Sequence, residues 1–255
     1  MSNNGFNIVK GVLIKYTGAD KDVVIPDEVK KISKRAFLGC SELTSVKIGS
    51  GVKKIGEWAF KDCKNIKEVT IENGEIGKYA FYECTGLTSV KIGNGVTKIG
   101  ESAFSDCKNL KEVTIENGEI GKWAFHECIG LTSVKVGNGI KKIDKFAFSK
   151  CTNLKEVTIE SGKIKEYAFS NCKIDKAVIE SKNVGNLMAE IKTLVLKKSV
   201  KKFDMVNFMK CKEVYCEAKK KPFGWKWSYT KKYHETMMSG GYYATVNWGV
   251  DISKV

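Results

Sequence analysis

The sequence predicts a β-rich solenoid, in which parallel strands stack in about nine right-handed coils between an N-terminal and a C-terminal cap. Two observations lead to this prediction. The first is a motif, Ala-Phe followed by two residues and Cys, that recurs at alternating intervals of 23 and 21 residues. The second is a pair of 44-residue units, residues 63–106 and 107–150, which match at 33 of 44 positions. Repeats of this kind indicate supersecondary units that bury their apolar edges by stacking.

Each repeat opens with a predicted strand. After the Cys the chain follows the pattern L-x-x-V-x-I, as at Leu43, Val46 and Ile48, and these spaced apolar residues are expected to face inward. A glycine-containing turn, a second inward isoleucine and the Ala-Phe pair follow. Long turns have two residues more than short turns, which explains the alternating interval. Neighbouring coils are therefore expected to pair their strands in parallel, about 4.8 Å apart.

The chain divides into three predicted segments. Residues 1–21 are expected to form an N-terminal cap hairpin, residues 22–216 the solenoid, and residues 217–255 an aromatic-rich C-terminal cap. The repeat pattern becomes degenerate from about residue 173. A cap is required at the end of the stack because the last coil would otherwise expose its apolar edge.

The C-terminal segment has its own strand pattern. Trp225, Trp227 and Tyr229 alternate as in a strand, and residues 243–248 are predicted to form a return strand after a glycine-containing turn. We therefore interpret its aromatic residues chiefly as a cap.

The repeat resembles the leucine-rich repeats of the BspA-like type, whose consensus includes I-x-x-x-AF-x-x-C. Residues 6–26 are similar to the N-terminal leader of such proteins, and the sequences KPFGW (221–225) and VNWGV (246–250) are similar to their C-terminal end. The resemblance implies a curved leucine-rich-repeat solenoid used for recognition, often on microbial surfaces.

The cysteines are predicted to form an interior ladder. Cys216 aligns with the strand residue Ile71. The other eight share one register, where unpaired cysteine packs as a small hydrophobe. Disulfides are disfavoured because parallel side chains keep the Cβ atoms too far apart, and zinc is disfavoured because a straight column does not converge on a point. Reduced thiols fit a reducing compartment better than an oxidising one. The predicted ladder comprises Cys40, Cys63, Cys84, Cys107, Cys128, Cys151, Cys172 and Cys211.

The outward positions of the predicted strands alternate between Ser-Lys and Glu-Thr in successive coils. One interpretation is a self-compensating charged face, in which each lysine lies diagonally opposite a glutamate of the neighbouring strand. The other is a concave recognition surface, the usual working face of a solenoid. The candidate binding residues on this face are Lys47, Glu68, Thr70, Lys91, Glu112, Thr114, Lys135, Glu156 and Thr158.

A second column consists of the residue before each Ala-Phe pair. Aromatic columns can stack on sugars or bases, but they more often cover the edge of a core. We expect the second of these roles here. The column comprises Trp58, Tyr79, Ser102, Trp123, Phe146 and Tyr167.

The formal net charge is +15, and the part from Lys176 onward is the most basic. Such a charge favours anionic partners, and lysines near aromatic residues are typical of proteins that bind single-stranded nucleic acid or an anionic glycan. Solvated lysine-rich turns are the simpler interpretation. The candidate patch comprises Lys197, Lys198, Lys201, Lys202, Lys219, Lys220 and Lys221.

The sequence lacks the motifs of a catalyst. His126 and His234 are far apart, and the paired glycines repeat with the solenoid as turn residues. We therefore expect a non-catalytic scaffold without cofactor or metal that binds a protein partner. The alternatives are a binder of anionic glycan or nucleic acid and a purely structural module.

The location of the protein is left open by the sequence. No apolar run approaches about 18 residues, so no membrane insertion is expected. The start of the chain does not have the pattern of a signal peptide. A cytoplasmic protein is expected if Met1 is the native start, and a secreted or cell-surface protein if a leader has been removed. The sequence does not indicate an oligomeric state.

Overall fold

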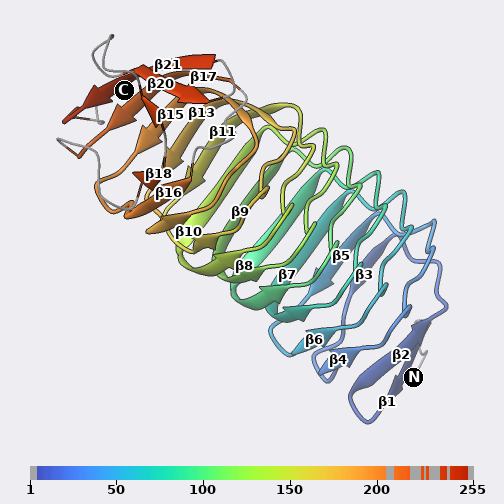
Figure 1. Cartoon of the computed structure of the whole chain (residues 1–255). Helices are drawn as coiled ribbons and strands as arrows, with labels where there is room; N and C mark the ends of the chain where they lie inside the picture. Colours follow the sequence, from blue (N-terminus) through green and yellow to red (C-terminus); the bar gives the residue numbers. More distant parts are fainter. Residues whose placement is uncertain are drawn as a thin grey trace.

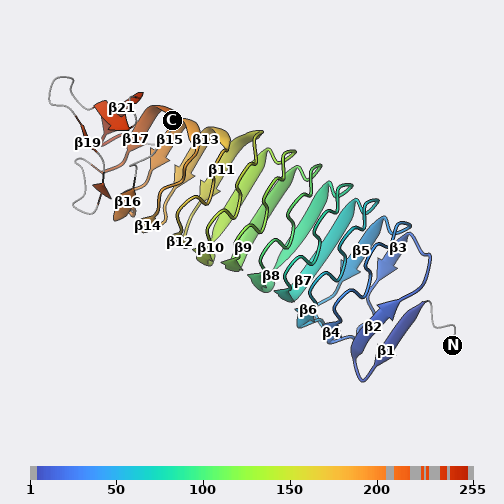
Figure 2. The same cartoon turned by 45° about the vertical axis from the view of Figure 1, so that its right-hand side comes forward.

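The protein forms one elongated stack of coils, seen from two directions in Figures 1 and 2. The computed structural model describes residues 5–204, 210–218, 225–226, 228–229, 236–239 and 242–251. The coils follow one another along the stack in chain order, so the N-terminal and C-terminal segments lie at opposite ends (Figure 2). The described residues form a parallel β-solenoid of about nine turns without a helix, which confirms the predicted fold class.

The first strand of each coil contributes to a continuous sheet, which we call the strand face. Its pairings are parallel and in register, so that Val46 aligns with Val69 and Val90 of the next two coils and their side chains point into the core. The strands of this face are β3 (Asp22–Val24), β5 (Ser45–Ile48), β7 (Glu68–Ile76), β8 (Ser89–Ile99), β9 (Glu112–Ile120), β10 (Ser133–Ile143), β11 (Leu154–Ile159), β13 (Lys173–Ile179), β15 (Glu190–Leu196), β17 (Lys210–Cys216) and β21 (Tyr242–Trp248).

The second inward isoleucine of each coil lies on another side of the stack, which we call the second face. It is formed by the ends of β7 to β10 together with β4 (Lys31–Ile32), β6 (Lys54–Ile55), β12 (Lys163–Ile164), β14 (Asn183–Val184), β16 (Lys202–Asp204) and β18 (Trp225–Lys226). The predicted turn between the two isoleucines is wrong for β7 to β10, because each continues as one strand around the corner. Shifts of register and Gly74 and Gly118, at φ +92° and +95°, accommodate the bend.

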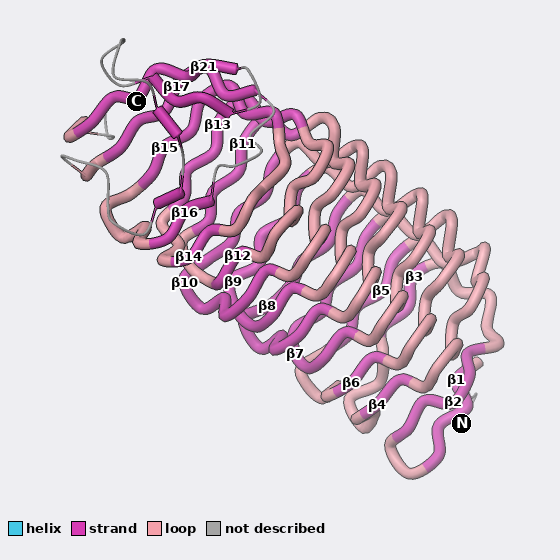
Figure 3. The backbone as a smooth tube through the Cα atoms, viewed as in Figure 1, coloured by secondary structure: helices cyan, strands magenta, loops and turns pink. Residues whose placement is uncertain are grey.

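The third side of each coil contains the Ala-Phe motif in consecutive turns, visible as loop segments in Figure 3. Two non-glycine positions per coil have a left-handed backbone, the residue before Ala-Phe and the residue before Cys, as at Trp58 (φ 56°) and Asp62 (φ 60°). Because these conformations recur from coil to coil, they belong to the architecture and do not mark a single strained site.

The core is a column of phenylalanine rings. From Phe37 to Phe169 consecutive rings stack with centroids 4.5 to 5.2 Å apart. The column is bordered by the inward valines and isoleucines of both faces. Each coil thus contributes one ring and buries it against the next coil, which explains why the motif must repeat.

Both ends of the stack carry antiparallel strands. At the N-terminus β1 (Phe6–Val9) and β2 (Val12–Tyr16) form a hairpin, and the Tyr16 ring extends the phenylalanine column by stacking on Phe37 at 4.9 Å. At the C-terminus β19 (Ser228–Tyr229), β20 (Thr236–Ser239) and β21 pair antiparallel in sequence. Trp225 belongs to β18, which pairs in parallel with β16 as a further coil. The predicted strand position Trp227 lies outside the described residues.

Candidate functional site

All nine cysteines are free thiols. The seven ladder cysteines from Cys63 onward, together with Cys216, are buried, and Cys40 at the N-terminal end is half-buried. Six thiols each donate a hydrogen bond to the carbonyl oxygen of the phenylalanine one coil earlier, at 3.0 to 3.3 Å. The donors are Cys63, Cys84, Cys107, Cys128, Cys151 and Cys172. These thiols therefore do more than fill apolar space, because each also donates a hydrogen bond that links two coils.

The thiols are poor nucleophiles. Burial raises the pKa of Cys63 and of Cys211 to about 12. It also raises the pKa of Cys84, Cys107 and Cys151 well above the ordinary value. Because the thiolate is the reactive form, such groups do not react at neutral pH. Among the described residues, no group of three or more His, Cys, Asp or Glu side chains could hold a metal ion.

The nine candidate residues of the strand face lie in two parallel rows. One row places Glu68, Glu112 and Glu156 between serines, and the other places lysines between threonines. The predicted diagonal ion pairs are wrong for two lysines, since Lys47 and Lys135 instead reach glutamates at the corner of the coil. Lys47 Nζ lies 3.8 Å from Glu72 Oε1, and Lys135 Nζ lies 3.9 Å from Glu116 Oε1. The rows are exposed or half-exposed, and none of the nine residues lines the cavity described next.

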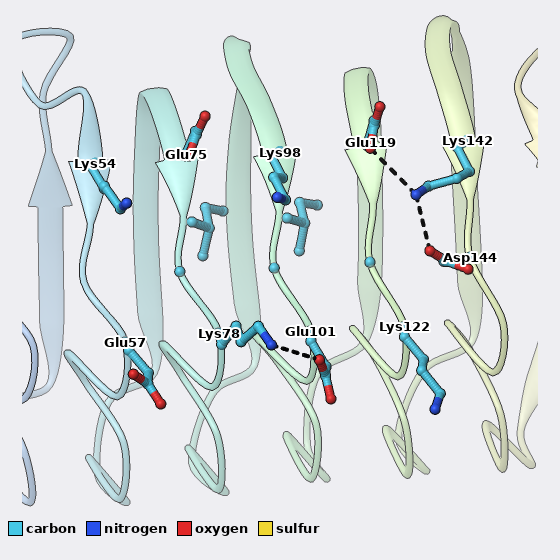
Figure 4. Close-up of a pocket in the computed structure, with 15 residues that line it drawn as sticks. Lys54, Glu57, Glu75, Lys78, Lys98, Glu101, Glu119, Lys122, Lys142 and Asp144 are labelled. Carbon is cyan, nitrogen blue, oxygen red and sulfur yellow. Dashed lines mark hydrogen bonds and ion pairs between the residues drawn. The ribbon is translucent and has the colours of Figure 1, made fainter.

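The second face contains a groove of about 400 Å³, shown in Figure 4. Its charged side chains form two rows that cross the coils. The upper row of Figure 4 consists of Lys54, Glu75, Lys98, Glu119 and Lys142, and the lower row of Glu57, Lys78, Glu101 and Lys122. The sign of the charge alternates along each row and also between the two rows of one coil. The lining is completed by Ile76, Gly77, Ile99, Gly100, Gly121 and Asp144.

Ion pairs hold part of this lining in place. Lys78 Nζ lies 3.1 Å from Glu101 Oε2, and Lys142 Nζ lies 3.5 Å from Glu119 Oε2 and 3.0 Å from Asp144 Oδ2. The hydrogen bond that Lys78 donates to Glu101 raises the pKa of Lys78. These contacts fix the lysines in their charged form on the walls of the groove.

Other lysines of the groove make no ion pair. Within the described part of the chain these are Lys54, Lys98 and Lys122, and the Lys122 amine lies 3.7 Å above the ring of Trp123. The groove thus combines fixed charges with amines, those of Lys54 and Lys98, that remain open to a ligand.

The floor of the groove is narrow because glycine follows the second isoleucine in several coils. A Cβ atom on Gly77 would lie 2.5 Å from the Ile55 carbonyl oxygen, and one on Gly100 would lie 2.7 Å from that of Ile76. No side chain fits at such distances, so the glycines allow the coils to stack closely. The absence of side chains there leaves the trough between the two charged rows.

This groove is not predicted by the repeat pattern alone. The signal is present in the alternation of K-I-G-E, as at residues 54–57 and 98–101, with E-I-G-K, as at residues 75–78 and 119–122. The alternation gains a meaning only when the coils stack in register and bring the two patterns side by side.

The aromatic column forms two runs on the third side. Trp58 and Tyr79 form the first, with Lys34 and Arg35 placed 4.3 and 4.5 Å from the ring of Trp58. Trp123, Phe146 and Tyr167 form the second, with centroids 6.0 and 5.4 Å apart. The buried Ser102 separates the two runs.

His126 also lies on this side of the coil. Its Nδ1 lies 2.6 Å from Ser149 Oγ, and its Nε2 lies 3.3 Å from Glu127 Oε1. Burial lowers the pKa of its imidazole, against the opposing effect of Glu127. The ring nitrogens therefore have partners outside the thiol column.

The candidate basic patch is brought together only in part. Lys197 lies between Glu180, at 3.7 Å, and Glu217, at 3.5 Å, so its charge is already balanced. Lys198, Lys201 and Lys202 are exposed. The remaining three, Lys219, Lys220 and Lys221, lie outside the described residues. None of the described segments is an apolar helix of membrane-spanning length.

These features define a solenoid repeat protein in which each coil from Phe37 to Cys172 contributes one stacked phenylalanine and one thiol. The model of the BspA type leucine-rich repeat region matches residues 15–118 and 74–188 with six copies. The chain therefore belongs to the BspA type leucine-rich repeat family.

Solved structures of bacterial leucine-rich repeat proteins share the fold. The T. pallidum leucine-rich repeat protein is 29% identical, with a TM-score of 0.58, over 63% of this chain and 80% of that chain. A leucine-rich repeat protein from Bacteroides ovatus is 18% identical, with a TM-score of 0.53, over 87% and 88% of the two chains. No curated protein sequence matches the chain.

Proposed function

We propose that the protein is a non-catalytic scaffold that binds a protein partner along the groove of its second face. The observation that supports this proposal is the concave trough itself, in which two rows of alternating charge flank an apolar and glycine floor. Binding sites are usually concave and combine apolar surface with a few fixed polar groups. The leucine-rich repeat family is consistent with such a scaffold.

The groove is a better candidate than the strand face. On the strand face, Lys47 and Lys135 reach their glutamates only at 3.8 and 3.9 Å, so these exposed side chains are less firmly held, and ordering such residues on binding is costly. In the groove, Lys78 and Lys142 are already held by ion pairs, so a partner meets side chains that are partly ordered. The alternating signs favour a protein segment that also carries both charges over a polymer of one sign.

Photo-crosslinking distinguishes the two faces. Lys91 on the strand face and Lys98 in the groove are exposed lysines at the two ends of the same strand, β8. Each can be replaced by benzoylphenylalanine without removing an ion pair of the described residues. In the cells or culture of the source organism, we expect a discrete protein adduct from position 98 and none from position 91. An adduct from position 91 alone places the partner on the strand face and contradicts the proposal.

A matched pair of variants completes the test. Lys98→Gln with Lys122→Gln removes two unpaired amines from the groove, and Lys91→Gln with Lys111→Gln removes two exposed amines from the strand face. Each pair changes the net charge equally. Recovery of the partner that the crosslink identified, measured by pull-down with chains that carry no crosslinker, should fall for the groove pair only. Equal recovery with both pairs contradicts a role for the groove.

A further inference from the structure

The upper row of the second face changes its charge pattern along the stack. From Lys54 to Lys142 it alternates between lysine and glutamate. Beyond β10 the register continues the row through Lys163, Asn183 and Lys202, and no carboxylate occurs in it. Beyond Lys142 this row is therefore basic, whereas its part in the groove is balanced.

A second set of lysines lies directly beside this part of the row. Each of these residues precedes the row in its coil: Lys141 adjoins Lys142, Lys182 adjoins Asn183, and Lys201 adjoins Lys202. The coils are in direct contact, because the backbone N–H groups of Lys201 and Lys202 both donate to the Lys182 carbonyl oxygen at 2.9 Å. Figure 2 shows β10, β12, β14 and β16 side by side along this edge of the stack.

Five of these lysines form what we call the lysine track: Lys141, Lys163, Lys182, Lys201 and Lys202. All five are exposed, and none makes an ion pair within the described part of the chain. Lys142 is excluded because Glu119 and Asp144 balance it. At a coil spacing of about 4.8 Å the track spans roughly 14 Å along the stack axis.

We propose that the lysine track binds a linear polysaccharide that carries sulfate or carboxylate groups, lying parallel to the stack axis. Amines without ion pairs at two adjoining positions of successive coils attract a linear polyanion, because successive anionic groups can each meet a lysine. The interaction is distinct from the groove, since it uses coils beyond Lys142 and needs charge of one sign.

The chemistry of the track favours a glycan over nucleic acid. Its cations are lysines only, and Arg35, the single arginine of the chain, follows β4, the strand that pairs with the N-terminal hairpin. The track thus lacks guanidinium groups, which pair with phosphate through two parallel hydrogen bonds. Proteins that bind single strands also stack bases on aromatic side chains, and the track itself contains none.

Size-defined heparin oligosaccharides are the probe, with fluorescence anisotropy as the measurement. We expect the wild-type chain to bind and its affinity to fall steeply with salt concentration. Replacing Lys163, Lys182, Lys201 and Lys202 by Gln should weaken binding at least about tenfold, because four of the contacting charges are removed together. The melting temperature of the variant shows that the fold is retained.

A matched control variant removes the same net charge elsewhere. It replaces Lys67, Lys91, Lys111 and Lys155, which lie on or beside the strand face, by Gln. This variant should keep its affinity within about twofold, because local charge and not total charge decides the affinity. Equal loss in the control and in the track variant overturns the proposal.

Two further results would also overturn it. One is the absence of binding to the sulfated probe at low salt. The other is tighter binding to an oligothymidylate of matched charge than to heparin, lost in the track variant, which identifies nucleic acid as the occupant.

Discussion

The thiol hydrogen bonds allow a test of whether a ladder cysteine acts as a hydrogen-bond donor or only as apolar filler. Cys128 is fully buried, and its Sγ donates to the Phe104 carbonyl oxygen at 3.1 Å. Cys128→Ala removes a net hydrogen bond of about 1 kcal/mol and leaves a methyl-sized void worth about 1–2 kcal/mol. Cys128→Ser keeps a donor at the same place, so it should cost only about 1 kcal/mol. We therefore expect the serine variant to be more stable than the alanine variant.

Urea unfolding followed by far-UV circular dichroism measures the difference, as the shift in midpoint multiplied by the m-value. Cys40 is the matched control, because it is half-buried and no hydrogen bond from its sulfur is found among the described residues. Its alanine and serine variants should agree within about 0.5 kcal/mol. If Cys128→Ser is less stable than Cys128→Ala, the thiol is apolar filler, because burying an unbonded hydroxyl costs more than the void.

Three other predictions follow from the coil geometry. Gly118→Ala should destabilise the fold by about 1–2 kcal/mol more than Gly39→Ala in thermal unfolding, since both residues have positive φ but only at Gly118 would a Cβ lie 2.5 Å from another coil. Lys142→Met should cost less than about 1 kcal/mol, and the cost should vanish in 1 M NaCl, because its ion pairs are only partly shielded from water. The contribution of the thiols to the unfolding free energy should stay constant below about pH 8 and fall between pH 9 and 12, because the unfolded chain loses thiol protons that burial makes the folded chain retain. Urea midpoints at pH 7, 9 and 11 test this, and an alanine variant of two buried cysteines should show a smaller fall.

Most of the fold could be predicted because each coil repeats the same inward residues. The spacing of Val46 and Ile48, repeated at Val69 and Ile71, predicts parallel strands in register, and the structure has this register. The corner was predicted less well. The sequence N-G at residues 73–74 is typical of a turn, but in the stack both residues pair with the next coil, since hydrogen bonds between coils compensate for the bend.

The groove could not be inferred from one coil, because none of its properties belongs to a single repeat. Lys98 and Glu101 are ordinary exposed residues until Glu75 and Lys78 of the preceding coil lie beside them. The same reasoning applies to Lys197, which counts as a free cation in the sequence but lies between two glutamates in the structure. Charge counted along the chain therefore overestimates the charge available to a ligand.

The alternating rows restrict how such a protein can grow by duplication. Copying the pair of coils from 63 to 106 adds one Glu75 and one Lys98 in order, so the upper row stays alternating at the new junction. Copying a single coil would place two glutamates or two lysines about 4.8 Å apart in this row, where like charges repel as Lys142 and Lys163 do further along the stack. Adding a pair of coils avoids this repulsion, so an engineer who lengthens this part of the molecule should insert coils in even numbers.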